Sequence, residues 1–442
     1  MMKKANNTQA ALLGLQHLLA MYSGAVAVPL LIGTALDFNT EQMTYLVSID
    51  IFMCGLATLL QLMRNRYFGI GLPVVLGCAI QAVEPLKMIG SQFTIQTMYG
   101  AIIVAGIFVC LVSGQFSKVK RLFPPVVTGT LITVIGLTLI PIAVQNIGGG
   151  NASAKDFGSL TNISLGFVTV ILILAIQVFA KGFLSSIAVL LGLVSGSLVA
   201  AALGLVSLAP LHEAPWFHIP QPFYFGVPHF EWSSSVTMII IALVSMVEST
   251  GVYFALGDIL NKKITEKDLK LGYRAEGMAV ILGGIFNTFP YTTFSQNVGL
   301  LELSGIKTKR PIYWSAGLLM LLGLLPKAGA LATMIPTPVL GGAMLVMFAM
   351  ISVQGIRILA SVDFTDQRNI LVVAVSIGLG LGVSIYPNIF QNLPRTVQLF
   401  LGNGIVVASL SSVLLNLAFK GREGLAKKDI KQQVRVLEEV DK

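Results

Sequence analysis

The chain has 442 residues, of which 55% are apolar and only 11% are charged, and its net charge is +9. A water-soluble protein of this length needs more polar surface, so the composition predicts a protein that lies largely in lipid. The excess Lys and Arg lie between and beyond the apolar runs, which favours a role in membrane topology over nucleic-acid binding.

The apolar runs predict an all-α protein that crosses the membrane many times, since most approach the length needed to span about 30 Å of hydrocarbon. We expect fourteen spans, at 8–33, 44–62, 68–83, 94–115, 125–143, 162–180, 185–208, 234–257, 271–288, 290–304, 311–329, 335–361, 368–386 and 396–420. With the N-terminus in the cytoplasm, nearly all Lys and Arg fall on cytoplasmic connections, which supports an even span count and a cytoplasmic C-terminus. The exceptions are Lys87, Lys155, Lys327 and Arg395.

Two similar segments lie seven spans apart: FPPVVTGT begins at residue 123 and IPTPVLGGA begins at residue 335. A repeat displaced by an odd number of spans must be inverted. The third and tenth spans also correspond, because both are short and each contains a proline, Pro73 or Pro290. Interrupted spans at matching places in two halves are typical of transporters that bind substrate near the bilayer midplane. The Pro- and aromatic-rich stretch 209–232 is expected to connect the halves outside.

Ionisable side chains inside predicted spans are costly and indicate candidate functional residues. Glu248 lies in the middle of its span among small residues, where a carboxylate can accept two N–H donors from a heterocycle. Glu276 follows Arg274, so an ion pair and a role in proton coupling both remain open. Asp50 and Glu84 lie near the external ends of their spans, where we expect water to reach them.

The stretch 286–305, FNTFPYTTFSQNVGLLELSG, contains the densest set of polar residues inside an apolar run. Pro290 interrupts the helix and frees backbone groups that a cavity or neighbouring protein must satisfy. Gln296 offers an amide donor beside a carbonyl acceptor, which matches one edge of a purine dione. We expect the residues before Gln296 to run extended against the break around Ala79 to Gln81, with Phe294 as an aromatic wall.

The remaining candidates are His17 and the cysteines. His17 favours an interhelical hydrogen bond over direct ligand binding. Three cysteines lie inside apolar runs without metal-ligand spacing, and three further histidines cluster in the external connection, so we expect no metal site and no metal cofactor. These residues are Cys54, Cys78, Cys110, His212, His218 and His229.

Two motifs give the chain a resemblance to the nucleobase-ascorbate transporter family, the nucleobase:cation symporter-2 family, over essentially all fourteen spans. The first is the family signature, which here consists of Gln296, Asn297, Gly299, Ser304 and Gly305. The second is the pair Gln16 and His17 of the first span. Ser304 stands where the signature has Thr and keeps the hydroxyl. The wider sequence is most similar to bacterial xanthine permeases.

The resemblance implies two inverted seven-span repeats, with short extended segments in spans 3 and 10. It also implies a core domain of spans 1–4 and 8–11, a gate domain of spans 5–7 and 12–14, an elevator mechanism, a homodimer and a bacterial cell membrane. The boundaries are 1–210 for the first repeat, 211–232 for the external loop, 233–420 for the second repeat, 421–442 for a cytoplasmic tail, about 8–115 and 234–329 for the core, and about 125–208 and 335–420 for the gate.

The resemblance also implies a substrate site. Glu248 and Gln296 would hold the base, completed by backbone around Ala79, Ile80, Phe294 and Ser295. Coupling or support of the site would fall to Glu276, Asn297, His17 and Gln16.

Gln296 and Val252 differ from the residues of uracil-type members and favour an oxidised purine. We expect a xanthine importer driven by proton symport, with urate as the near alternative and sodium coupling left open. An anion carrier or channel on the same architecture is a more distant alternative. An intramembrane enzyme is disfavoured because the chain has no HExxH pattern.

Overall fold

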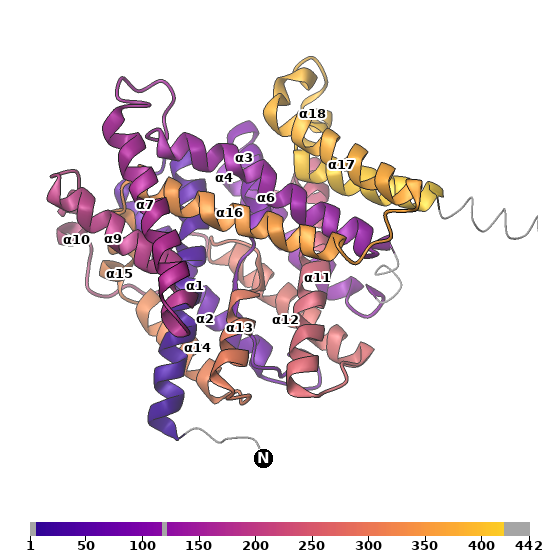
Figure 1. The fold of residues 1–442 in the computed structure, drawn as a ribbon, viewed down its shortest axis with the longest axis horizontal. Helices are drawn as coiled ribbons and strands as arrows, with labels where there is room; N and C mark the ends of the chain where they lie inside the picture. The colour runs from indigo at the N-terminus through magenta and orange to yellow at the C-terminus, as the bar shows by residue number, and fades with distance from the viewer. Residues whose placement is uncertain (1–5, 117–121, 420–442) are drawn as a thin grey trace, which may run out of the picture.

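The computed structural model describes residues 6–116 and 122–419, and Figure 1 shows their arrangement. The first half contains α1 (Asn7–Ala35), α2 (Thr40–Leu62), β1 (Leu76–Cys78), the 3-10 helix η1 (Ile80–Ala82), α3 (Val83–Gln92), α4 (Ile95–Val112), α6 (Pro125–Ile147), α7 (Leu160–Phe179), α8 (Phe183–Ser186) and α9 (Ala188–Ala202). After the short α10 (Ala209–Glu213), the second half contains α11 (Trp232–Leu260), α12 (Glu266–Ile285), β2 (Tyr291–Thr293), α13 (Gln296–Ser304), α14 (Arg310–Gly323), α15 (Pro326–Thr333), α16 (Thr337–Leu359), α17 (Gln367–Ile385), η3 (Pro387–Phe390), α18 (Arg395–Leu401) and a helix over Gly404–Phe419. The tail predicted over 421–442 lies outside the described residues.

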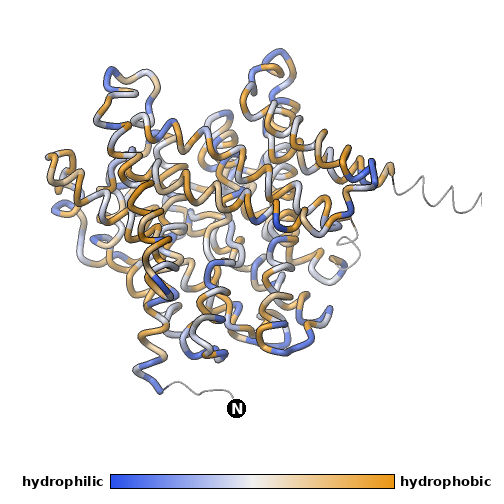
Figure 2. Tube along the Cα trace, viewed as in Figure 1, coloured by the Kyte–Doolittle hydropathy of each residue, from blue (hydrophilic) through white to orange (hydrophobic). Residues whose placement is uncertain are grey.

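Eight helices in the described part of the chain are long and apolar enough to cross a membrane, or up to ten if each of two bent pairs is one span. The bends are 82° between α14 and α15, and 71° between α18 and the helix Gly404–Phe419. Apolar residues run along the helices, and hydrophilic residues gather at their ends and connections (Figure 2). The chain is therefore a mostly helical membrane protein with several spans.

Four of the fourteen predicted spans do not pass as membrane-crossing helices, for reasons visible in their sequences. The segment 68–83 contains β1 and η1, and 290–304 contains β2 and the short α13. The predicted span 185–208 is helical mainly over α9, which has 15 residues. The segment 271–288 falls in α12, which carries charged residues in its first turns. The count of fourteen stays a prediction.

Polar side chains define where several helices begin. Asn39 accepts a hydrogen bond from the Gln42 backbone N–H at 2.8 Å, and the Gln42 side chain accepts in return from the Asn39 N–H at 3.1 Å, which starts α2. Glu231 caps α11 by accepting from the backbone of Ser233 and Ser234. Burial opposes ionisation of Glu231, but these hydrogen bonds prevail and hold the pKa of its carboxyl below the ordinary value.

Two short strands meet inside the helical body, and we call β1, β2 and the α2 residues Asp50, Cys54 and Thr58 that contact them the strand crossing. Strand β1 pairs antiparallel with β2, with Leu76 opposite Thr293 and Cys78 opposite Tyr291. The extended segments predicted in the third and tenth spans are therefore present, but the partner of β2 is Leu76–Cys78 rather than Ala79 to Gln81. The Ala79 N–H donates to the Pro290 carbonyl at 2.8 Å, and the chain then turns into η1.

The connection between the two halves packs against the ends of α2 and α4. The Tyr45 and Tyr224 rings stack with their centroids 3.8 Å apart, and the Tyr45 hydroxyl donates to the Gln221 carbonyl at 3.0 Å. From α4, the Gln96 side chain donates to the Phe225 carbonyl at 2.8 Å. Aromatic and amide contacts therefore attach this Pro-rich connection to the helices beside it.

Helices α6 and α16 run antiparallel and side by side (Figure 1). They begin at the two segments whose sequences are similar, each has 23 residues, and each follows a proline in extended conformation, Pro124 or Pro336. Glycines bring their backbones together: a Cβ on Gly136 would lie 2.5 Å from the Ser352 backbone nitrogen, and one on Gly355 would lie 2.3 Å from that of Thr133. Small residues at a helix interface in lipid allow the two backbones to approach this closely.

Candidate functional site

Glu248 lies on α11, half-buried, with its carboxylate held from the first broken span. The Gln81 side-chain amide donates to Glu248 Oε2 at 3.0 Å and to Ser245 Oγ at 2.8 Å. Gln81 is the middle residue of η1, three residues after the end of β1. The broken span therefore contributes a side chain that orients the carboxylate, in addition to any backbone groups. Gln81 was expected only as the end of the break in the third span, and its side-chain bond to Glu248 was not, although it is a polar residue inside an interrupted apolar run.

Ser295 and Gln296 are exposed at the start of α13, directly after β2, while Phe294 before them is buried. The Phe294 ring lies between two glycines: a Cβ on Gly24 of α1 would approach the ring to 2.7 Å, and one on Gly77 of β1 to 2.4 Å. Phe294 is thus packed in the junction of α1 and the strands. The Gln296 amide stays accessible beside it.

The backbone groups predicted to complete the site are partly occupied. The Ala79 N–H donates to Pro290, and the Phe294 N–H donates to the Val75 carbonyl at 2.9 Å. Both N–H groups therefore bind carbonyls of the other interrupted segment and are not free to bind a ligand. Ile80, the first residue of η1, is half-buried, and its contribution stays a prediction.

Glu276 is buried on α12, and its carboxylate accepts a hydrogen bond from the Tyr253 hydroxyl of α11. The Gln61 side chain of α2 donates to the Tyr253 oxygen at 2.6 Å and to the Gly272 carbonyl at 3.1 Å. Among the described residues Glu276 forms no ion pair with Arg274, so of the two roles left open by the sequence the ion pair is not present, and the role in coupling stays a prediction.

A small void of about 20 Å³ lies between α4, α11 and α12, and both Ser245 and Glu276 line it. Such a volume holds about one water molecule. Ser245 accepts from Gln81, which also donates to Glu248, so the void lies between Glu276 and the side chains that hold Glu248.

The signature residue Asn297 is buried and links α13 to α1. Its side-chain nitrogen donates to the His17 carbonyl at 2.9 Å and lies 3.2 Å from His17 Nδ1. The structure therefore confirms that His17 forms an interhelical hydrogen bond. Gln16, its neighbour, is half-buried, and its role stays a prediction.

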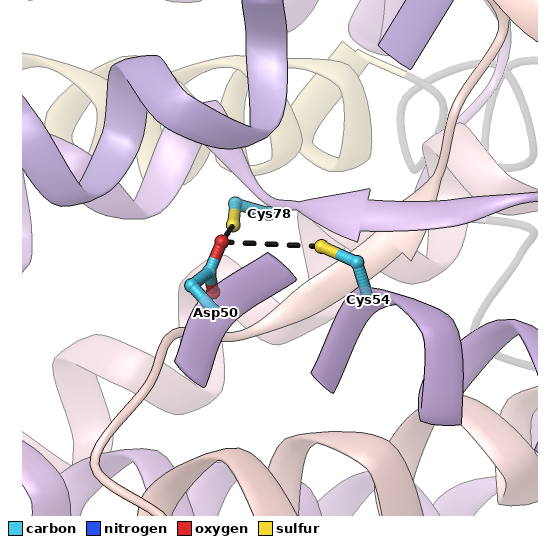
Figure 3. Close-up of side chains that lie close together, drawn as sticks. All are labelled: Asp50, Cys54 and Cys78. Atoms are coloured by element: carbon cyan, nitrogen blue, oxygen red, sulfur yellow. Dashed lines mark hydrogen bonds between the residues drawn. The ribbon is translucent and has the colours of Figure 1, made fainter. Parts of the chain in front are cut away.

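Asp50 is the clearest departure from the expected placement. It was expected near water, but it is wholly buried, because β1 and β2 cross directly beside this part of α2. Figure 3 shows Cys78 on β1 and Cys54 on the same helix, both directed at the carboxylate. Among the described residues these three form the one set of His, Cys and acidic side chains whose ligand atoms lie within 4.8 Å of one another. By contrast, Glu84 is partly exposed and pairs with Lys87 at 3.0 Å.

Two interrupted apolar segments whose strands pair inside the helical body, with a half-buried carboxylate and an accessible amide on adjoining helices, define a multi-pass membrane transporter. Residues 8–389 match the model of a permease family. The chain belongs to this family, that of the nucleobase-ascorbate transporters.

The relatives extend over nearly the whole chain. It is 53% identical to the uric acid permease PucK of Bacillus subtilis, covering 96% of this chain and 98% of that protein. It is also 53% identical to the xanthine permease of the same organism, covering 92% and 93%. The fold resembles the transmembrane domain of the cyanobacterial bicarbonate transporter BicA, with a TM-score of 0.64, 18% identity and coverage of 87% and 98%.

Proposed function

We propose that the protein imports an oxidised purine base, with xanthine as the favoured substrate and urate as the near alternative. The observation that carries the proposal is the pairing of a half-buried carboxylate, Glu248, with an accessible amide, Gln296, at two ends of the strand crossing. The carboxylate accepts N–H donors, and the amide matches an adjacent donor and acceptor. Relatives that carry the names xanthine permease and uric acid permease support this class of substrate.

The architecture we propose has fourteen spans in two inverted repeats. Element order and length support it: α1 and α11 each have 29 residues, β1 and β2 each have three, and α6 and α16 each have 23. The core would contain the strand crossing with spans 1–4 and 8–11, and the gate would contain the α6–α16 pair with the remaining spans. Transport would move the core past the gate as an elevator, in a homodimer in the bacterial cell membrane with both termini cytoplasmic.

We propose that protons drive import, with no cofactor. The support is the Gln81 side chain, which donates to Glu248 and Ser245, together with the small void that Ser245 and Glu276 both line. A proton taken up by a buried carboxyl removes the cost of moving an empty anionic site through lipid. Sodium coupling is the competing mechanism. Uptake that stops with a protonophore and is indifferent to sodium supports protons, and the reverse pattern excludes them.

An anion carrier is the second candidate, because the fold resembles that of a bicarbonate transporter. A likeness at 18% identity carries the fold alone, and the site presents a carboxylate where an anion would favour Arg or Lys.

Competition among purines tests the proposed site. Uptake of labelled xanthine and of labelled urate is measured in cells against unlabelled xanthine, urate, hypoxanthine, guanine, uracil and bicarbonate. Glu248→Gln and Gln296→Ala should each reduce uptake at least about tenfold, the usual effect of losing a hydrogen bond to a charged or buried group. The control variants Glu302→Gln and Gln177→Ala change exposed side chains of the same types. Normal uptake and selectivity in both site variants would refute the assignment.

A further inference from the structure

The Asp50 carboxylate is fully buried on α2, and both of its oxygens contact donors from the crossing strands. The Cys78 thiol of β1 donates to Oδ2 at 2.6 Å, and the Tyr291 hydroxyl of β2 lies 2.8 Å from Oδ1. Tyr291 has a single proton; since the Thr288 hydroxyl, 2.8 Å away, can donate to the phenol oxygen, that proton is available to Asp50. Cys54 makes a longer contact with Oδ2, at 3.9 Å.

The two donors are not independent, because Cys78 and Tyr291 are direct partners in the antiparallel register. One carboxylate therefore bridges a pair of opposed residues on the two strands. Four residues separate Asp50 from Cys54 and Cys54 from Thr58, so all three lie along one face of α2. The Thr58 hydroxyl accepts from the Leu76 N–H at 3.0 Å, at the other end of β1.

Through these hydrogen bonds α2 fixes the positions of both strands. Beyond β1 the chain reaches Gln81, which holds Glu248, and beyond β2 it reaches Gln296. A change in the spacing of the two strands would therefore move the two proposed binding groups relative to each other.

We propose that Asp50 is a positioning residue for substrate binding. By accepting one hydrogen bond from each strand, it sets the distance between Glu248, which Gln81 holds, and Gln296. Asp50 need not touch the substrate itself. This proposal rests on the proposed function, since it assigns Asp50 to the site formed by Glu248 and Gln296.

A metal site is the other chemistry that two thiols and a carboxylate offer. A structural zinc site uses four ligands, and the cluster offers three. A zinc ion would also require the Cys78 thiolate, which would remove the donor that now binds Oδ2. The hydrogen bonds already present satisfy the carboxylate without these changes, so the geometry favours a tether between the strands.

The test compares variants that remove one hydrogen bond with variants that keep it. Cys78→Ala and Tyr291→Phe each remove one donor, Asp50→Asn leaves one carbonyl acceptor, and Cys78→Ser keeps a donor at the same place. Cys110→Ala is the matched control, because the Cys110 thiol contacts the Arg274 carbonyl outside the cluster. KM and Vmax for xanthine and urate uptake are measured together with the amount of folded protein in the membrane and its Tm in detergent.

We expect Asp50→Asn, Cys78→Ala and Tyr291→Phe to raise KM about tenfold, as the loss of one hydrogen bond to a charged group would. Cys78→Ser should restore the KM of the wild type. The double variant of Asp50→Asn with Tyr291→Phe should raise KM by less than the product of the two single effects, since Asp50 and Tyr291 are hydrogen-bond partners. If Asp50→Asn does not fold, Cys78→Ala and Tyr291→Phe still decide the matter.

Three results would overturn the tether. The first is an unchanged KM in the folded donor variants, and the second is a lowered Tm with no change in KM, which indicates a purely structural role. The third is stoichiometric zinc in the purified protein that disappears in Cys54→Ala and Cys78→Ala. If Glu248→Gln and Gln296→Ala transport normally, the proposed function fails instead, so the two failures are distinguishable.

Discussion

The strand crossing and the α6–α16 pair hold chain segments together in different ways. At the crossing, three-residue strands replace helical turns, so backbone groups lose their intrahelical partners in a region where lipid offers none. The side chains of α2 supply the missing partners: Thr58 binds the Leu76 N–H, and Asp50 binds the side chains of the last residue of β1 and the first of β2. Directional hydrogen bonds therefore fix this region.

The α6–α16 pair depends much less on such partners, because each helix satisfies most of its own backbone, with Pro141 of α6 as an interruption. Its buried hydroxyls donate within their own helix: Thr130 donates to the Val126 carbonyl, and Thr133 donates to the Gly129 carbonyl. What fixes the pair is shape, since Gly136 and Gly355 let the two backbones touch. Irregular backbone in the membrane thus depends on specific polar side chains, whereas regular helices depend on small ones.

The largest expected effect comes from filling the glycine contact. A valine at Gly136 would place its Cβ 2.2 Å from Ser352 Oγ and 2.5 Å from the Ser352 nitrogen, so α6 and α16 would have to separate. We expect Gly136→Val to destabilise the protein by about 3 kcal/mol, at the upper end of overpacking effects, and to reduce the folded amount in the membrane. Thermal unfolding in detergent measures the change.

Gly378→Val on α17 is the control, because a Cβ there meets nothing within 4 Å. It should leave the Tm near that of the wild type. Equal losses in both variants would show that the helix glycines act through the backbone alone, and shape would no longer distinguish the α6–α16 pair.

A threonine in each region gives a smaller and more specific comparison. Thr58 and Thr130 are both fully buried, but only Thr58 accepts from a backbone N–H of another segment. Thr58→Val keeps the shape and leaves the Leu76 N–H without its partner, which should cost about 1–2 kcal/mol. Thr130→Val removes a hydroxyl that bonds only its own helix and should change stability by less than about 0.5 kcal/mol.

Thermal unfolding of the two threonine variants, with KM for uptake, decides between these expectations. We expect Thr58→Val to raise KM as well, because β1 leads to Gln81 and Glu248. The comparison fails if Thr130→Val is as destabilising as Thr58→Val.

The sequence predicts one region better than the other, for a physical reason. The similar segments at 123 and 335 and the prolines beside them already indicate two equivalent helices, because helix starts leave local signals in the sequence. The break at Pro290 and the polar residues after it likewise identify Gln296 and Asn297 as candidates, and its place inside an apolar run identifies Glu248. Contacts between distant segments leave no such signal.

In the strand crossing, the partners of the polar residues come from distant segments and cannot be predicted from the sequence nearby. Asp50 reads as a carboxylate near a membrane surface, since nothing nearby in the sequence reveals that Cys78 and Tyr291 converge on it. The roles of Gln81 and Tyr253 depend in the same way on long-range pairing, with Glu248 and Glu276 respectively. Polar residues inside apolar runs could have been flagged as a class, but their partners come only from the fold.

The smallest expected effect lies outside both regions, at the N-terminal cap of α12, where one partner of an ion pair is exposed to water. Asp268, in the first turn of α12, accepts from the Thr265 backbone at 3.0 Å and hydroxyl at 2.7 Å and pairs with Arg64 at 2.6 Å. Burial opposes ionisation, but the hydrogen bonds from Thr265 and the Arg64 charge hold the pKa of Asp268 below its ordinary value. A lowered carboxyl pKa stabilises the fold above the ordinary value of about 3.9, and this stability is lost as the pH falls through the folded pKa.

Asp268→Asn should therefore lower stability by at most about 1 kcal/mol at pH 7, because Arg64 is 40% exposed and solvent screens the pair. The difference from the wild type should begin to shrink below about pH 4, where the carboxyl of the unfolded chain takes up protons, and should disappear as the pH falls through the lower pKa of the folded state. Asp258→Asn, which changes an exposed side chain near the end of α11, is the control and should have no effect at either pH. A loss as large as that of Thr58→Val would mean that a capping bond at a helix end stabilises the protein as strongly as a hydrogen bond in the strand crossing. That result would contradict the expected order of the two effects.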